Sequence, residues 1–456
     1  MNHFKKYTQW LPFLAAFGLS IALFWATPGL SPAGQRTLVV FIWAIVGWSF
    51  TSLDATVVAI GAALLMWGLG LTQGQLVLSG LGDSFIGFVI AGFMLGGAYK
   101  LTGLSGQLAR WFGRRAHRVG DLFYWLTFAL VVLSFVIPAT SARAALMLPI
   151  YTAVAAQLPS AGARKGLAVL FPVIIVLSCV TSYLGAGANL LTASYITSIT
   201  GEKITYAQWF LLGGPIGIVS CGVSAWVIVH LFLTKAERDM PFGTIETENT
   251  PVDAVKNRRL GVVTAALLGL WITEPLHHLD AGMVALAGAL VLCVPQTGVM
   301  TLKQALKEVE WSLVLFMAAT LELSRALVDN GVVAYGMALF KQMANGWSGE
   351  AILVVVLAAA LLSHLLIHSR TARAAVLLPV LVPLAMSAGH SGLLVAFFAN
   401  AAMGYCITLP ICAKPVALFS TAGGDGYTTG DLLRLSARLL PFHLLLFVAA
   451  YWTYRG

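Results

Sequence analysis

The sequence predicts an all-α protein that crosses a membrane many times, and three observations lead to this fold class. Of the 456 residues, 59% are hydrophobic and only 10% are charged, whereas a soluble chain carries about 25% charged residues. Apolar runs near the roughly 20 residues that a membrane-crossing helix needs recur along the whole chain. These runs are continuously apolar and do not alternate, which excludes a transmembrane β-barrel and leaves helices as the spanning elements.

The apolar runs divide the chain into two halves. The predicted spans cover residues 10–27, 37–52, 54–72, 83–101, 166–184, 207–233, 260–275, 279–296, 311–328, 391–409 and 436–454. The first run is long for a signal-peptide core, so we interpret it as a retained span. A polar stretch at 234–259 is predicted to be a cytoplasmic linker. Residues 1–233 then hold the first span and a first repeat, and 260–456 a second repeat.

Two further apolar stretches, 121–158 and 350–388, are too long for one span each. Small and cationic residues interrupt them near the middle, at 138–143 and at 368–373. A helix that enters the membrane, turns inside it and leaves on the same side produces this pattern. Such non-helical backbone is tolerated at that depth only when it is buried in protein or lines a wet cavity. We therefore predict two re-entrant hairpins.

The basic residues test this topology. With a cytoplasmic N-terminus and two hairpins, five of the 27 Lys and Arg residues lie outside and four lie within the membrane, which leaves 18 on the cytoplasmic side. Cytoplasmic loops are enriched in Lys and Arg, so the distribution favours a multi-pass protein of a bacterial inner membrane. The net charge of +9 follows from this topology and does not indicate a nucleic-acid partner.

The two halves carry matching motifs around their interruptions. The first reads SARAALMLP from Ser141 to Pro149, and the second reads TARAAVLLP from Thr371 to Pro379. Further on, each half has a second break rich in small residues, at 184–189 and at 409–415. The first hairpin opens to the cytoplasm and the second to the opposite side, so the repeats are inverted. Inverted repeats whose broken helices meet near the midplane are typical of secondary transporters.

At these residues the sequence resembles the divalent anion/sodium symporter family, which includes dicarboxylate and citrate carriers. That family has a Ser-Asn-Thr triplet at each hairpin tip, ten residues before a proline, and G-T-P-P-N-like breaks. The corresponding positions here are Ala139–Ser141, Ser369–Thr371, Gly185–Asn189 and, loosely, Cys412–Val416. The resemblance implies an elevator-type carrier of di- or tricarboxylates, with a scaffold domain that forms a homodimer and a transport domain that moves.

The departures from the family pattern concern sodium. In the family, the serine and asparagine of each triplet help to form two sodium sites, and the threonine contacts a substrate carboxylate. Both triplet asparagines are replaced here, by Thr140 and Arg370, and Val416 stands at the asparagine of the second break. A guanidinium group has no acceptor oxygen for a sodium ion. We therefore expect sodium-independent exchange, without a metal or cofactor.

The predicted substrate-binding residues lie at the tips and breaks of both repeats. They are Thr140, Ser141, Arg143, Gly187, Asn189, Ser369, Arg370, Thr371, Arg373 and Lys414. Ionisable groups inside a membrane are costly and usually functional. Arg370 and Lys414 are favoured for anion binding, because Arg suits carboxylate recognition. Arg143 and Arg373 have an alternative role, in which they brace the hairpins by capping helix carbonyls or by pairing with Glu322.

Other functions stay open at this stage. A sodium- or proton-coupled symporter of the same fold is one, with His364, His368 and Glu322 as coupling groups, although such histidines are more often packing residues. Transport of sulfate or arsenite, or sodium/proton exchange, is another. A membrane-embedded enzyme is not favoured, because no span carries paired aspartates, a Ser-His pair or an HExxH motif. The five cysteines show no CxxC spacing and are interpreted as reduced, buried thiols.

Overall fold

The fold is helical throughout the part of the chain that the computed structural model describes. This part comprises residues 17–18, 20–22, 27–51, 53–72, 81–82, 84–102, 115–135, 137, 140–158, 160–243, 253–296, 298–343, 346–367, 369–420 and 426–455. Within it there is no strand, only an isolated bridge between Arg118 and Pro241. Most of the predicted first span, 10–27, falls outside these residues.

The first half contains helices in and between the predicted spans. They are α3 (Pro32–Phe50), α4 (Ala55–Gly68), α6 (Ser84–Leu101), α8 (Val119–Leu133), α9 (Thr140–Gln157), α10 (Ala161–Leu177), α11 (Gly187–Thr200), α12 (Tyr206–Phe232) and α13 (Lys235–Asp239), with 3-10 turns at Ser178–Thr181 and Tyr183–Gly185. The predicted span 166–184 therefore ends in two tight turns, and α11 follows them where no span was predicted.

The second half repeats this order. It contains α14 (Ala254–Ile272), α15 (Glu274–His277), α16 (Ala281–Val291), α17 (Leu302–Lys307), α18 (Trp311–Asp329), α19 (Val332–Met343), α20 (Gly349–Leu362), α21 (Arg370–Ser387), α22 (Gly392–Met403), α23 (Lys414–Ser420) and α24 (Thr429–Arg455), with 3-10 turns at Ser363–Leu365 and Pro410–Cys412. Helix α14 begins inside the predicted linker, because Asp253 caps it through the amides of Val255 and Lys256.

Several helices are suited to a membrane by length and composition. Five of them are at least 18 residues long and apolar enough to cross one: Ala161–Thr181, Tyr206–Phe232, Trp311–Asp329, Arg370–Ser387 and Thr429–Arg455. The span predicted at 279–296 is shorter than expected, since α16 ends at Val291 and the chain turns immediately after it.

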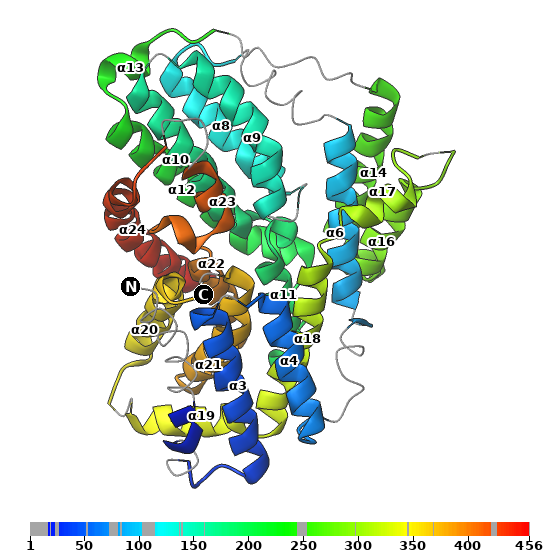
Figure 1. Cartoon of the computed structure of the whole chain (residues 1–456), viewed down its shortest axis with the longest axis vertical. Coiled ribbons are helices and arrows are strands. Elements are labelled where there is room, and N and C mark those ends of the chain that lie inside the picture. The colour runs from blue at the N-terminus through cyan, green and yellow to red at the C-terminus, as the bar shows by residue number, and fades with distance from the viewer. Residues whose placement is uncertain are drawn as a thin grey trace, which may run out of the picture.

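Both interrupted stretches form antiparallel helical hairpins. The start of α8 lies beside Arg238 of α13. Helix α9 leads directly into α10, whose start lies beside Glu237 of α13, so α9 ends near the place where α8 begins. The start of α20 lies beside the end of α21, where His390 Nε2 is 2.8 Å from the Gly349 carbonyl oxygen. Figure 1 shows the α8–α9 pair opening toward the top of the molecule and the α20–α21 pair toward the bottom. The two hairpins therefore point their tips at each other.

The helices form two groups that pack mainly within themselves. Helices α4, α6, α14, α16 and α18 form the first group, together with α3, and Figure 1 shows most of it on the right. Helices α8–α12 and α20–α24 form the second group. Within the second group the repeats interlock, because α21 packs on α11 and α23 packs on α9 and α10. Each hairpin thus contacts the helix that follows the break of the other repeat.

Candidate functional site

Arg370 links the two repeats at the centre of the molecule. It is the first residue of α21, directly after Ser369, whose hydroxyl caps this helix by accepting the Ala372 amide. The Nη2 of Arg370 donates to Asn189 Oδ1 at 3.0 Å and to the Asn400 carbonyl oxygen at 3.4 Å. The tip of the second hairpin therefore reaches the break of the first repeat.

The other two nitrogens of this guanidinium group, Nε and Nη1, are buried without a partner in the described part of the chain. Arg370 is half-buried, and among the described residues neither Nε nor Nη1 has a hydrogen-bond acceptor. The group also lies within electrostatic range of the positive charges of Arg143 and Arg373. Because buried polar groups are nearly always hydrogen-bonded, these two N–H groups indicate a site for an additional acceptor.

Asn189 holds the opposite side of the contact in place. It is fully buried in the first turn of α11, and its Nδ2 donates to the carbonyl oxygens of Cys179 at 2.8 Å and Ser182 at 2.9 Å. The N-cap residue of α11 is Ala186, which has no side-chain acceptor for the first amides. A helix N-terminus with free amides attracts an anion. Gly187, predicted as a site residue, is the first residue of this helix.

Asn400 belongs to the same network and was not predicted. It is fully buried in α22, and its Nδ2 donates to Asn189 Oδ1 at 2.9 Å. Its own Oδ1 has no donor among the described residues. The sequence could have indicated this residue, because a polar asparagine inside the apolar run 391–409 is costly in a membrane and usually has a function.

Arg143 braces the first hairpin. Its side chain is fully buried and donates to the Gly185 carbonyl oxygen at 2.7 Å, Ser178 Oγ at 3.1 Å and Cys179 Sγ at 2.9 Å. These contacts tie α9 to the break of its own repeat. They correspond to the alternative role, in which the arginine caps helix carbonyls.

Arg373 makes the equivalent contacts in the second repeat. It is fully buried and donates to the carbonyl oxygens of Ile367 at 2.7 Å and Met403 at 2.9 Å, and to Cys406 Sγ. The two arginines of the repeated motif therefore occupy matching positions. Glu322, the other predicted partner of these arginines, accepts instead from Arg325 Nη1 at 3.1 Å.

The remaining predicted residues are spread more widely. Ser141 donates to Glu310 Oε1 at 3.2 Å, a carboxylate that was not predicted. Thr140 and Thr371 are half-buried. Lys414 is exposed at the start of α23 and interacts electrostatically with Asp54.

His364 is a packing residue in this structure. It is fully buried, its Nδ1 lies 2.6 Å from the Leu361 carbonyl oxygen, and its Nε2 lies 2.7 Å from Thr408 Oγ1. Both ring nitrogens therefore have partners. His368, the second candidate for proton coupling, lies outside the described residues.

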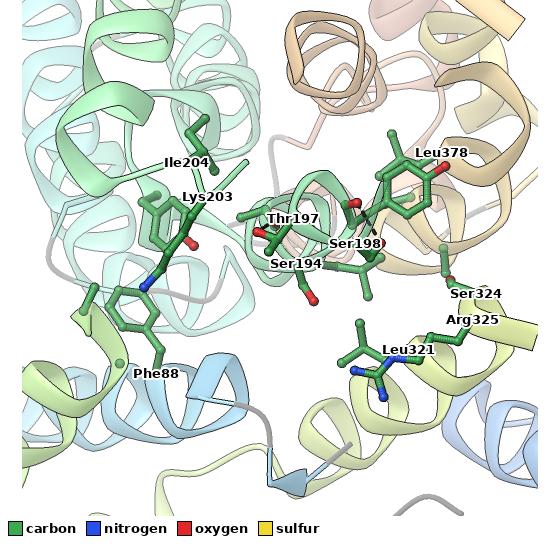
Figure 2. Close-up of a pocket in the computed structure, with 18 of the residues that line it drawn as sticks. Phe88, Ser194, Thr197, Ser198, Lys203, Ile204, Leu321, Ser324, Arg325 and Leu378 are labelled. Carbon is green, nitrogen blue, oxygen red and sulfur yellow. Dashed lines mark hydrogen bonds between the residues drawn. The ribbon is translucent and has the colours of Figure 1, made fainter. Parts of the chain in front are cut away.

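A cavity of about 380 Å³ lies one helical turn from Arg370 and Asn189. Its walls come from α11 and α21 on one side and from α6, α16 and α18 on the other. Figure 2 shows Lys203 and Arg325 on opposite sides, with Ser194 between them. None of the predicted binding residues lines this cavity.

Comparison with known families identifies the chain. The model of the sodium:sulfate symporter transmembrane region matches residues 5–454, nearly the whole sequence. The chain belongs to the divalent anion:sodium symporter family. It is thus a polytopic membrane transporter of small anions and not an enzyme, as the sequence predicted.

Curated relatives align over about three quarters or more of this family member. A protein of Escherichia coli (strain K12) named as an L-tartrate/succinate antiporter is 27% identical, with 97% of each chain covered. A protein of Cupriavidus necator named only as a membrane protein is 26% identical over 99% of this chain and 94% of its own. YflS of Bacillus subtilis (strain 168), named as a candidate malate transporter, is 27% identical over 73% and 72%.

Solved structures support the fold. The YdaH transporter of Alcanivorax borkumensis superposes with a TM-score of 0.56 at 14% identity, covering 91% of this chain and 96% of its own. MtrF of Neisseria gonorrhoeae superposes with a TM-score of 0.57 at 11% identity, covering 95% and 97%. At these identities the likeness concerns the arrangement of helices alone.

Proposed function

We propose that this transporter exchanges di- or tricarboxylates across the inner membrane without sodium. Arg370 carries the proposal. Its Nε and Nη1 atoms have no acceptor among the described residues, and its bond to Asn189 holds it at the first turn of α11. A carboxylate placed there receives charge-assisted hydrogen bonds from the guanidinium group and faces the positive end of the α11 dipole.

The charge of the centre favours an anion with more than one negative charge. Arg143 and Arg373 are both close enough to Arg370 to influence it electrostatically, and among the described residues none of the three forms an ion pair with a carboxylate. Leaving buried charges unpaired is strongly unfavourable. The substrate supplies the missing negative charge, which explains why three cations are kept together.

The same arrangement favours exchange over net uptake. When the site is empty, the fixed cations stay in the membrane without a counter-ion, and moving them across is costly. The loaded carrier should therefore cross faster than the empty one. The L-tartrate/succinate antiporter of Escherichia coli, whose name states exchange of two dicarboxylates, supports both the substrate class and the mode of transport.

The proposal includes an elevator mechanism and a homodimer with a cytoplasmic N-terminus. Helices α8–α12 and α20–α24 would move as one body against the helices around α4, α14 and α16. Large apolar side chains exposed on α4, α14 and α16, including Trp67, Val262 and Met283, are suited to lipid or to a second copy. The mass of the detergent-solubilised protein, measured by light scattering, tests the dimer: a monomeric mass would contradict it.

Uptake into proteoliposomes tests the function. We expect labelled succinate to enter vesicles that contain unlabelled succinate, at equal rates in sodium and in choline buffer, and to enter empty vesicles at least about tenfold more slowly. The reason is the cost of returning the empty, positively charged site.

Two results would contradict the proposal. Uptake into empty vesicles that stops when sodium is removed would establish a sodium symporter. Uptake that falls steeply as the external pH rises, without need for internal anion, would establish proton symport. Vesicles without protein are the control for leakage in both cases.

A further inference from the structure

The cavity between the two helix groups has the composition of a binding site. Its volume of about 380 Å³ falls in the range of roughly 300–1,000 Å³ that is usual for small-molecule pockets. Apolar walls formed by residues such as Phe88 and Leu378 alternate with hydroxyl groups. A dicarboxylate, with charged ends and an apolar middle, matches this pattern.

The cationic groups that line the cavity can face an anion. Lys203 and Arg325 line it together with Asp280, and each cation also pairs with a carboxylate, Lys203 with Asp280 and Arg325 with Glu322. The carboxylates of Glu274 and Glu322, which also pair with these cations, are nearly buried and do not line the cavity. Figure 2 shows Lys203 and Arg325 on opposite sides of the drawn residues, with the amino group of Lys203 beside Phe88.

Hydroxyl groups also line the cavity. The hydroxyl of Tyr195, a lining residue that is only 5% exposed, has no hydrogen-bond partner among the described residues. Because a buried polar group without a partner is uncommon, it indicates an unseen ligand or water. Ser194 and Ser324 bring two further hydroxyls to the walls.

The position of the cavity links it to the central site. Ala374 and Leu191 line it, and they lie four and two residues beyond Arg370 and Asn189 in their helices. An anion in the cavity is thus about one helical turn from the unpaired N–H groups of Arg370.

We propose that this cavity is a second, outer binding site, which holds a dicarboxylate before it reaches Arg370. Arg325 is its principal ligand. The side chain of Arg325 is 48% exposed, whereas that of its partner Glu322 is 8% exposed, so the guanidinium group can contact an entering carboxylate without leaving Glu322. This inference rests on the proposed function for the identity of the ligand, but occupancy of the cavity can be measured without transport.

Protection of an introduced thiol tests the outer site. In Ser324→Cys, we expect a small, membrane-impermeant thiol reagent that carries a sulfonate to label the cavity. Succinate should slow this labelling at least about fivefold. The protection should persist in the double variant Ser324→Cys/Arg370→Ala, because the outer site does not need Arg370. The chain with Ser324 intact measures labelling of the native cysteines, of which all but Cys293 are buried.

Variants of Arg325 assign the ligand. Arg325→Gln should abolish protection of the introduced thiol and raise the apparent KM for uptake about tenfold, and Arg325→Lys should restore much of both. Lys303→Gln, which removes an exposed cation on α17, is the matched control and should change neither. The size-exclusion profile of each variant verifies that it is folded.

The outcomes separate the two proposals. Uptake of succinate without protection of the introduced thiol, or protection that disappears with Arg370→Ala, would overturn the outer site and leave the proposed function intact. Protection in a protein that transports no dicarboxylate would support the outer site and overturn the proposed function.

Discussion

At the scale of single residues, Arg370 and the two arginines of the repeated motif differ in what they contact. Arg143 and Arg373 donate to carbonyl oxygens and to a thiol within their own repeat. Arg370 crosses to Asn189 in the other repeat, and its Nε and Nη1 have no acceptor in the part of the chain that the structure describes. Structural support and substrate binding are therefore assigned to different arginines.

Arg370→Ala should abolish uptake while leaving the fold largely intact. The guanidinium group makes two hydrogen bonds with the described residues, and it is the main ligand of the proposed substrate. Arg370→Lys should keep the charge and lose the planar geometry, so we expect at least about a tenfold fall in uptake. Proteoliposome uptake and the thermal midpoint measure the two effects. Normal uptake by Arg370→Ala would show that the site is assigned incorrectly.

Asn400→Ala should impair uptake without removing a charge. Its amide holds the Asn189 oxygen that accepts from Arg370, so its loss frees the guanidinium group to change orientation. We expect a fall of about tenfold in uptake and a loss of roughly 1–3 kcal/mol of stability, the usual cost of a buried group left without its partner. Asn330→Ala, which removes bonds to carbonyl oxygens far from the centre, is the control for a general loss of stability.

At the scale of elements, glycine permits the first break to fold tightly. A Cβ at Gly185 would lie 2.2 Å from the Cys179 carbonyl oxygen, a backbone atom that cannot turn aside. The Gly185 carbonyl oxygen also accepts from Arg143. The small residues at the break therefore allow close approach of the backbone, as their pattern in the sequence indicated.

Gly185→Ala should destabilise the protein by about 1–3 kcal/mol, the typical cost of forcing extra volume into a packed interior. The shift of the break should also weaken uptake through Arg143. Gly222→Ala, in α12, provides the matched control, because a Cβ there meets nothing within 4 Å and alanine favours a helix. Thermal unfolding in detergent measures both variants. Equal midpoints would contradict the proposed steric role of Gly185.

At the scale of the whole molecule, an ion pair joins the two helix groups. Lys203, in the turn after α11, lies 2.8 Å from Asp280 and 3.7 Å from Glu274. Burial alone would raise the pKa of the Asp280 carboxyl, but the hydrogen bond and charge of Lys203, together with the amides of Met283 and Gly282, outweigh it, so this pKa is lowered from 3.8. A lowered carboxyl pKa stabilises the fold above the unfolded value, and the contribution is lost as pH falls through the folded value.

Asp280→Asn should therefore lower the thermal midpoint slightly between pH 6 and 8, and the difference should shrink progressively as pH falls below about 4. The expected loss is less than about 1 kcal/mol, because the pair is partly exposed. Asparagine still caps α16, where Asp280 accepts from Gly282 and Met283, so the variant isolates the charge. Asp253→Asn, a helix cap that faces only Lys256, is the control. A difference that persists in acid would contradict the role of the pair.

Local sequence determined the all-helical fold class and the places where the long apolar stretches are interrupted. Each depends on properties that a short segment carries by itself, namely apolar length, small residues at an interruption and a motif such as SARAALMLP. The role of Arg373 as a brace could also be predicted from the sequence, because its carbonyl partner Ile367 lies only six residues away in the chain.

Only the tertiary structure decided which residues meet. The Arg370–Asn189 contact joins residues 181 positions apart, and Asn400 and Asn189 are 211 apart. The same packing placed Glu310 beside Ser141 and left Lys414 exposed. A span's composition determines that it enters the membrane, but the rotation and depth of each helix are determined by packing against its neighbours. These contacts therefore follow from the assembled helices and could not be read from any single segment.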